Sequence, residues 1–364
     1  MRLIFVLDLV DSVYTDANFD HCEVVPVRRL DLKSSTAVGF DSSHRFYVME
    51  LYHGPTWAFK DYALLMVGAL LEYFLGKRKQ HLNILIATSG DTGSSTINAI
   101  QCRRNMDIWV LFPAAGRITQ VQECQMTSVL DENVHVFSAD GNSDELDDAL
   151  LQIYNDGTFV SAHNIISVNS INWARIAVQV AHWIYGYLRV RGDSSYWQNE
   201  AGSSNCGTRE QNFELEVVVP TGACGNITAG LVARQMGIPI RIVACTTDEN
   251  SAVADLISKG YMECNDDVSV KKTMAPAMDI AKPYNVERIL AILSNGSFVP
   301  TNYSYSLPDN LHNTMRSIFS SFRANTSAIQ SAIRECANSY DYLSCPHTAT
   351  ALAYCLHQQQ RTTT

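Results

Sequence analysis

A regular alternation of two kinds of segment, beginning near residue 82, constrains the fold more than any other feature of this sequence. Short apolar runs predict strands, and each of them except the last is followed by a longer run with helical periodicity. The predicted strands are 83–87, 108–112, 134–137, 165–168, 215–219 and 240–244, and the predicted helices are 92–102, 121–130, 143–154, 173–190 and 227–236. This alternation predicts an α/β fold with mostly parallel, doubly wound sheets that helices cover on both faces.

Three segments do not follow this alternation of strands and helices. Residues 191–212 are rich in Ser, Gly, Asn and charged residues, and they predict a surface insertion. The run 240–244 is expected to close the series of strands. Residues 311–337 contain almost no helix breakers and predict continuous helix, whereas the polar tail at 358–364 is expected to lack fixed structure.

Composition excludes several classes of protein. The chain has 364 residues, 46% of them hydrophobic, and a net charge of −10, which argues against a nucleic-acid partner. No apolar run approaches the ~18 residues that a membrane span needs. The 10 cysteines are scattered singly, without a disulfide framework or a metal-binding grouping, so we expect a reduced, cytoplasmic protein without a metal.

A lysine at the start of a predicted helix is the first candidate site residue. Lys60 follows the irregular segment HGPTWAF at 53–59 and precedes an apolar run at 62–74. Alone, such a lysine is most often an ordinary solvated residue. Two later segments, TSGDTG at 88–93 and PTGACGN at 220–226, each follow a predicted strand and open a predicted helix, as anion-binding loops do. A lysine with two such loops is what an enzyme needs to hold pyridoxal 5'-phosphate.

Each loop also has an interpretation without a ligand. The small residues of the segment TGACG at 221–225 would let backbone N–H groups converge on the cofactor phosphate, but a tight strand-to-helix turn explains them equally well. Ser89, Gly90, Asp91 and Thr92 would hold a substrate carboxylate, with hydroxyls from Ser89 and Thr92. The alternative is a helix capped by a Ser or Thr side chain. Asp91 itself would repel a carboxylate unless its side chain turns away. The neighbouring Asp61 is expected to be structural.

The order of several short segments resembles the threonine synthase family, and within it the animal threonine synthase-like 2 branch. These segments are HGPT-x-A-FKD, T-SGDTG, GRI-x-x-x-Q-x-x-QM, NSINWAR, VP-TGACGN, PAMDI and CPHTA. The similarity extends from about residue 21 to residue 351. It implies a fold-type II, tryptophan synthase β-like enzyme that depends on pyridoxal phosphate.

The resemblance also implies roles for individual residues. It assigns the cofactor lysine to Lys60 and the cofactor phosphate loop to Thr221, Gly222, Ala223, Cys224 and Gly225. It places Thr348 near the pyridine nitrogen. Asn172 and Arg175 are candidates for contact with a substrate phosphate, against the alternatives of a helix N-cap and a surface ion pair. Arg117 is a weaker phosphate candidate.

The sequence also departs from the family pattern. Ala223 replaces the asparagine of the usual GNFG loop, and Ser251 replaces an aspartate. Segments that normally precede and follow the motifs are largely absent. We therefore expect residues 1–45 to be a remnant of an N-terminal domain, and 46–364 to be the catalytic domain, with a smaller subdomain at about 85–170.

The resemblance implies a phospho-lyase that acts on small phosphorylated amino acids. It would eliminate phosphate from O-phosphothreonine or O-phosphohomoserine and give 2-oxobutyrate and ammonia. The alternatives are threonine synthase, which would form threonine from O-phosphohomoserine, and a catalytically dead binding protein that keeps the fold. A homodimer is expected.

Overall fold

The computed structural model describes residues 2–33, 45–88, 90–114, 118–141, 143–193, 213–263, 270–280 and 282–362. Two compact units share the chain. Unit 1 comprises Met1–Pro26 and Glu50–Gln179, and unit 2 comprises Val27–Met49 and Val180–Thr364. Residues 27–49 thus pack with the later part of the chain, and the domain boundary expected at residue 45 stays a prediction.

Unit 1 is built around a parallel sheet with strand order β5-β4-β3-β6. Its elements are α1 (Arg2–Val13), α2 (Lys60–Arg78), β3 (Leu82–Ala87), α3 (Asp91–Ile100), β4 (Met106–Pro113), α4 (Gln120–Thr127), β5 (Val134–Ala139), α5 (Ser143–Asn155), α6 (Gly157–His163), β6 (Ile165–Ile166) and the first part of α7 (Trp173–Arg191). Every strand and helix predicted here is present, with ends shifted by a few residues.

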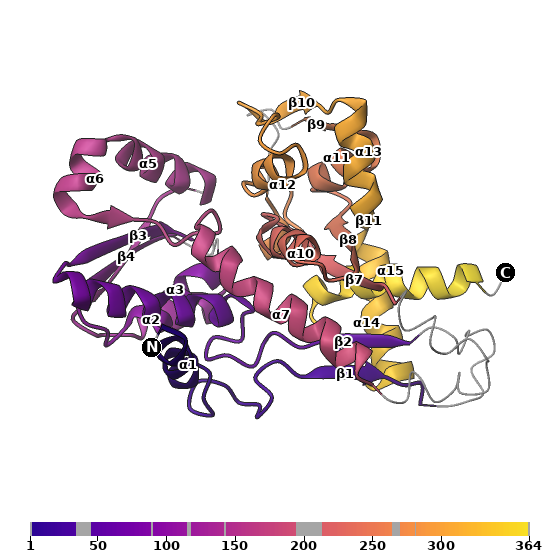
Figure 1. The fold of residues 1–364 in the computed structure, drawn as a ribbon, viewed down its shortest axis with the longest axis horizontal. Coiled ribbons are helices and arrows are strands. Elements are labelled where there is room, and N and C mark those ends of the chain that lie inside the picture. Colours follow the sequence, from indigo (N-terminus) through magenta and orange to yellow (C-terminus); the bar gives the residue numbers. More distant parts are fainter. Residues whose placement is uncertain are drawn as a thin grey trace. The chain divides into compact units, whose positions relative to one another are not determined.

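Alternation along the strands of unit 1 separates the two faces of the sheet. Ile84 pairs with Ile108 and Ile86 with Val110, so these four fully buried side chains share one face. Ala87 lies on the opposite face, in a cluster with Leu146 and Leu150 of α5. Helices α2 and α3 lie on one side of the sheet and α5 and α6 on the other (Figure 1).

Unit 2 contains a second parallel sheet with strand order β11-β8-β7. Its elements are β1 (Val27–Leu30), β2 (Phe46–Met49), the rest of α7, β7 (Leu215–Pro220), α10 (Gly225–Gln235), β8 (Ile240–Thr247), α11 (Ala252–Lys259), β9 (Tyr261–Glu263), a short 3-10 helix (Pro276–Met278), α12 (Val286–Leu293), β10 (Ser304–Ser306), α13 (Asp309–Ile318), β11 (Phe319–Ala324), α14 (Thr326–Tyr340) and α15 (Pro346–Thr362). The pairs β1–β2 and β9–β10 are antiparallel.

Four predictions for unit 2 were wrong or fall outside the described residues. The continuous helix expected at 311–337 is interrupted by β11, which pairs in parallel with β8, so 240–244 is not the last strand. Helix α15 extends into the tail that was expected to be irregular. The expected insertion at 191–212 lies mostly outside the described residues. Strand β11 escaped prediction because FSSFRA has no strong strand pattern, and its pairing partner lies far away in sequence.

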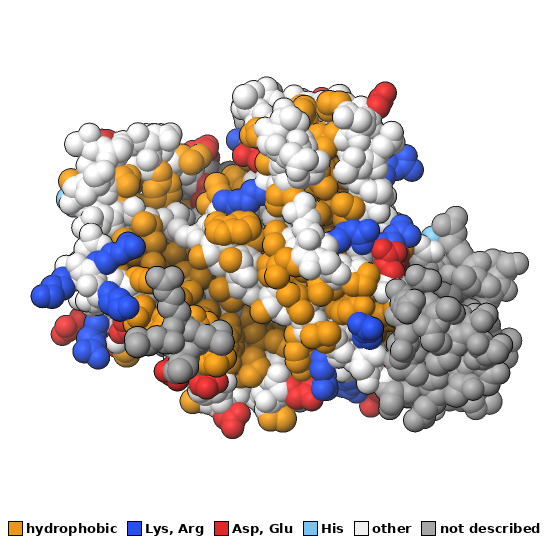
Figure 2. Space-filling model, in the orientation of Figure 1, with side chains coloured by type: hydrophobic (Ala, Val, Ile, Leu, Met, Phe, Trp, Pro, Cys, Tyr) orange, Lys and Arg blue, Asp and Glu red, His pale blue; other side chains and the backbone are white. Residues whose placement is uncertain are grey.

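The surface mixes charged and apolar side chains. Figure 2 shows basic side chains close to acidic ones on one face of the molecule, with many hydrophobic side chains exposed. Exposed apolar surface of this kind is normal for folded proteins, so it does not by itself mark a binding site. Among the described residues, no helix is long and apolar enough to cross a membrane.

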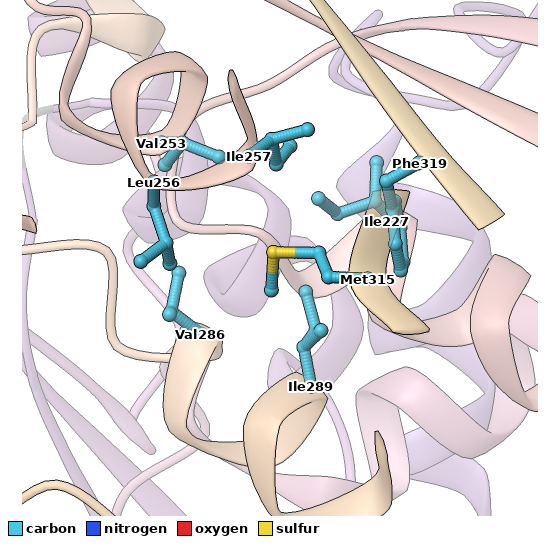
Figure 3. A pocket seen from close by; sticks show the side chains of 8 residues that line it. All are labelled: Ile227, Val253, Leu256, Ile257, Val286, Ile289, Met315 and Phe319. Atoms are coloured by element: carbon cyan, nitrogen blue, oxygen red, sulfur yellow. The ribbon is translucent and has the colours of Figure 1, made fainter. Parts of the chain in front are cut away.

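Helices cover both faces of the unit 2 sheet. Ala351 of α15 packs against Val243 and Cys245 on one face. On the other side, α10, α11, α12 and α13 enclose a small apolar cavity, in which Met315 and Phe319 meet the other lining side chains (Figure 3). The lining carries no polar side chain, so this cavity belongs to the core and offers nothing that could hold a phosphate or a carboxylate.

Phe319 should therefore be a strong determinant of stability. Its side chain is 2% exposed, and Phe319→Ala is expected to lower the free energy of unfolding by about 3–5 kcal/mol, because it enlarges this cavity. The matched control is Phe74→Ala, which removes the same group from a side chain that is 45% exposed. Urea denaturation should show a clearly smaller loss for the control. Equal losses would contradict the core position of β11.

Candidate active site

Lys60 is the first residue of α2, as the sequence predicted, and its side chain is only 14% exposed. Its Nζ lies 2.9 Å from Oδ2 of Asp91, the first residue of α3. The lysine is therefore neither an ordinary solvated residue nor an isolated cation, because a carboxylate from a neighbouring loop holds its amine.

Asp61 builds the loop that precedes Lys60. Its fully buried carboxylate accepts hydrogen bonds from the Thr56 amide at 2.9 Å and the Thr56 hydroxyl at 2.6 Å. Burial raises the pKa of Asp61, and these hydrogen bonds oppose that shift. Gly54 lies so close to this carboxylate that a Cβ at residue 54 would overlap it. Asp61 is thus structural, as expected.

The loop before α3 is stabilised by a residue that the sequence analysis did not select. The buried Thr88 hydroxyl accepts hydrogen bonds from the Gly90 and Gly93 amides, each at 3.0 Å. Gly90 is the N-cap residue of α3 at φ 138°, a conformation that favours glycine, and it has no side chain that could cap the helix. The Thr88 hydroxyl takes the first-turn amide of Gly93 instead, so a Thr side chain does cap α3, as the alternative held, although Thr88 is not the N-cap residue itself. The signal for Thr88 was its position directly after a strand.

The structure gives a different outcome for each candidate carboxylate-binding residue of this loop. Asp91 directs its carboxylate to Lys60 rather than to an open position, so its predicted contact with a substrate carboxylate has no support. The Thr92 hydroxyl has no partner among the described residues and stays a candidate. Ser89 lies outside the described residues, as does Arg117.

Asn172 is the residue that caps α7. Its Oδ1 accepts a hydrogen bond from the Ala174 amide at 2.9 Å, and its Nδ2 donates to the Ser167 carbonyl at 2.8 Å. The structure thus shows the N-cap that was considered as the alternative. Contact between Asn172 and a substrate phosphate stays a prediction.

Arg175, one helical turn later, is a buried cation. Its side chain is 3% exposed and donates one hydrogen bond, from Nη1 to the Val168 carbonyl at 3.0 Å. Its Nε has no partner in the described structure, and burial lowers the pKa of Arg175 to about 10. The alternative of a surface ion pair was wrong. A buried guanidinium without a carboxylate is costly unless an anion binds there.

The loop 221–225 in unit 2 connects β7 to α10. Cys224 adopts a left-handed conformation at φ 64°, and α10 begins at Gly225. The Thr221 amide donates to Cys245 of β8 and the Ala223 carbonyl accepts from Asn285, so both ends of the loop are fixed. Among the described residues, the Gly222, Ala223 and Cys224 amides have no partner, and the first N–H groups of a helix have none within it. These N–H groups are available to a phosphate.

Gly222 packs against the PAMDI segment, which in turn contacts the segment that contains Thr348. A Cβ at residue 222 would lie 2.8 Å from the Ala277 carbonyl oxygen. The Ala277 amide donates to Nε2 of His347 at 3.0 Å. The structure therefore links the phosphate loop to His347, the residue directly before Thr348, inside unit 2.

Thr348 lies in the first turn of α15, beside the thiol of Cys345. Its hydroxyl is 3.3 Å from Sγ of Cys345, and its amide also donates to this sulfur. Burial raises the pKa of the Cys345 thiol, but hydrogen bonds with His347 and Thr348 outweigh it and lower the pKa to about 7. The role of Thr348 toward a pyridine nitrogen stays a prediction.

These residues fit pyridoxal phosphate. Unit 1 supplies a mostly buried amine with an acidic partner, and unit 2 supplies a loop with unpaired N–H groups at a helix start. The amine suits the cofactor aldehyde, and the N–H groups suit its phosphate.

Two glycines of the loop should respond differently to substitution. Gly222→Ala places a methyl group against the Ala277 backbone, so it should lower both the melting temperature and the affinity for pyridoxal phosphate, the latter roughly tenfold or more. At Gly225 a Cβ would meet only the Asn285 side chain, at 3.4 Å. Gly225→Ala should therefore keep the melting temperature of the cofactor-free protein, and lose affinity only if phosphate occupies the loop. Unchanged affinity in both variants, measured by fluorescence titration, would contradict the assignment.

Comparison with known proteins gives a consistent result. The family of pyridoxal-phosphate dependent enzymes matches residues 26–363. Threonine synthase-like 2 of Xenopus laevis is 42% identical over 361 residues, which cover 97% of this chain and 69% of that protein. The Homo sapiens protein of the same name is 38% identical, with 97% and 68% covered.

Solved structures of threonine synthases resemble the fold of this chain. A threonine synthase from Brucella melitensis with bound pyridoxal phosphate superimposes with a TM-score of 0.79 at 30% identity, over 96% of this chain and 70% of that chain. Yeast threonine synthase gives a TM-score of 0.80 at 30% identity, over 98% and 70%. These matches confirm the predicted cofactor and the fold-type II architecture. The chain belongs to the threonine synthase family of pyridoxal-phosphate dependent enzymes and groups with the animal threonine synthase-like 2 branch.

Proposed function

We propose that this enzyme is a phospho-lyase that releases inorganic phosphate from O-phosphothreonine, and also from O-phosphohomoserine. Water and O-phosphothreonine would give 2-oxobutyrate, ammonia and phosphate. The observation that carries this proposal is Arg175, a buried cation without an acidic partner in the described structure. Such a group suits a small amino-acid substrate that brings its own dianionic phosphate.

Lys60 has two tasks in this proposal. When bound, pyridoxal phosphate supplies an electron sink that stabilises negative charge at the substrate α-carbon. Lys60 would hold the cofactor by its aldehyde, and its Nζ would take the α proton of the substrate. Asp91 keeps that Nζ in place while the amine is free.

Other residues orient the substrate. Thr92 offers a hydroxyl without a partner in the described structure to the carboxylate, and the start of α3 favours a negative charge. Arg175 holds the phosphate while the bond between its oxygen and the β carbon breaks. Asn172 fixes the start of the helix that carries Arg175, through its hydrogen bond to the Ala174 amide.

The competing functions differ in the fate of the unsaturated product. Threonine synthase would add water at the β carbon and needs an ordered water in a closed site. Ala223 supplies no polar side chain to hold such a water, which favours elimination. The replacement at Ser251 is a weaker argument for elimination. Its hydroxyl donates to Asp255 at 3.1 Å, and the same carboxylate forms ion pairs with Lys259 and Arg323. A binding protein without catalytic activity would require neither the ion pair between Lys60 and Asp91 nor a buried Arg175 without an acidic partner in the described structure.

Two finer expectations remain proposals. A cytoplasmic location is supported by free cysteines, eight of which lie in the described residues. A homodimer is supported by the family alone.

The products of the reaction test the proposed function. Incubation with O-phosphothreonine should give 2-oxobutyrate, ammonia and phosphate in equal amounts, whereas O-phosphohomoserine should give little free threonine. Mass spectrometry and a phosphate assay would measure this. Threonine as the main product would identify a synthase, and bound cofactor without turnover of either substrate would identify a dead enzyme.

Lys60→Ala is the control for this assay. The variant should fold and bind cofactor phosphate but lose covalent cofactor attachment and all turnover, because the amine that would react with the cofactor aldehyde is removed. Borohydride treatment of the parent protein should fix the cofactor to the peptide that contains Lys60. Attachment to another lysine would overturn the site.

Arg175→Met separates binding from stability. Replacing a buried, unpaired cation with an apolar side chain of similar length should leave the melting temperature unchanged or raise it. The KM for O-phosphothreonine should rise roughly tenfold or more, since a charge-assisted hydrogen bond is lost. Arg323→Met, which removes a surface ion pair with Asp248, should leave KM unchanged. An unchanged KM in Arg175→Met would remove Arg175 from the substrate site.

A further inference from the structure

Helix α4 carries a motif that the proposed function leaves without a role. In the segment GRI-x-x-x-Q-x-x-QM, the two glutamines and the methionine are Gln122, Gln125 and Met126. Their spacing places them on one face of the helix. They are buried or half-buried, whereas Gln120, Val121, Glu123 and Cys124 are exposed. The face that carries the motif is therefore the face that packs against the protein.

Gln122 contacts the partner of the catalytic lysine. Its Nε2 donates to Oδ1 of Asp91 at 2.7 Å, while Oδ2 of the same carboxylate lies 2.9 Å from Nζ of Lys60. The Asp91 carboxylate thus bridges the Gln122 amide and the Lys60 amine.

The N-cap of α4 fixes the orientation of the Gln122 amide. Its Oε1 accepts hydrogen bonds from the Thr119 hydroxyl at 2.9 Å and from the Thr119 amide at 3.2 Å. Thr119 Oγ1 in turn accepts a hydrogen bond from the backbone N–H of Gln122, so the two residues form a capping box. With the oxygen held in this way, only the NH₂ group can face Asp91, and only this group can donate to a carboxylate.

The same helix face fixes the neighbouring loops. A Cβ at Gly90 would overlap the Gln122 amide, so the side chain packs directly on the Gly90 backbone. Gln125 Nε2 donates to the Thr56 carbonyl at 3.3 Å, in the loop that leads to Lys60. The fully buried Met126 occupies the space next to Gly93. Helix α4 therefore contacts both loops that place the lysine and its carboxylate.

We propose that Gln122 is a positioning residue for the reaction: anchored by Thr119, it holds the Asp91 carboxylate against Lys60 and so fixes the free amine. The inference rests on the proposed function for its catalytic meaning. Lys60 would need a fixed amine whenever its Nζ is not bonded to the cofactor. At that stage the Gln122–Asp91 pair keeps Nζ from rotating away.

Chemical labelling of Lys60 in the cofactor-free protein tests this chain of contacts. An amine that a carboxylate holds attacks an acylating reagent more slowly than a free amine. Gln122→Met should therefore speed acetylation of Lys60, followed by mass spectrometry, roughly three- to tenfold. Asp91→Asn should speed it at least as much. The double variant Gln122→Met/Asp91→Asn should be no faster than Asp91→Asn alone, because Gln122 acts through Asp91.

Matched variants separate positioning from a general loss of structure. Gln120→Met makes the same change on the exposed face of α4 and should leave the labelling rate unchanged. Thr119→Val removes the hydroxyl that anchors Gln122 and should raise the rate in the same direction, whereas Thr119→Ser should keep the parent rate. These two variants keep the test open if Gln122→Met does not fold.

Two results would overturn the inference. One is an unchanged labelling rate in both Gln122→Met and Thr119→Val. The other is an acceleration by Gln122→Met that is as large in the Asp91→Asn background as in the parent. Labelling requires neither cofactor nor substrate, so a failure of the proposed phospho-lyase reaction is distinguishable from a failure here.

Discussion

Both loops that the sequence predicts to bind anions depend on one constraint, which is that a helix leaves its first N–H groups without partners. Strands β3 and β7 each end in a loop that opens a helix, α3 and α10. In the first loop the Thr88 hydroxyl accepts hydrogen bonds from the Gly90 and Gly93 amides. In the second, amides of residues 222–224 have no partner in the described structure. Both loops join the end of a strand to the start of a helix. They differ in whether a nearby side chain accepts hydrogen bonds from their N–H groups.

The environment of Lys60 shows how unit 1 accommodates a mostly buried amine. Asp91 supplies the opposite charge, Gln122 satisfies the second carboxylate oxygen, and Thr119 satisfies the Gln122 oxygen. Each polar group in this series therefore has a partner, which a low-dielectric interior requires. The last residue of the series lies at the solvent-exposed start of α4, where the cap can be formed without burying further charge.

Arg175 is the contrasting case. It is as buried as the core, yet the only hydrogen bond of its side chain in the described structure is to the Val168 carbonyl. Folding alone gives no reason to keep a cation in such a place, because an apolar side chain would fill the space at lower cost. The proposed function would supply that reason, because the phosphate of the proposed substrate has the charge and shape for a guanidinium.

The sequence by itself determined the α/β class, nearly all strands of both parallel sheets, and the position of Lys60 at a helix start. These features follow from local periodicity and from short motifs, which depend only on residues close together in the sequence. Only the tertiary structure decided that FSSFRA at 319–324 is a strand, because its pairing with β8 joins residues 77 positions apart. In the same way, it assigned Asp91 to Lys60 and buried Arg175. Each of these outcomes depends on which side chains from distant segments meet, and local pattern contains no information about that.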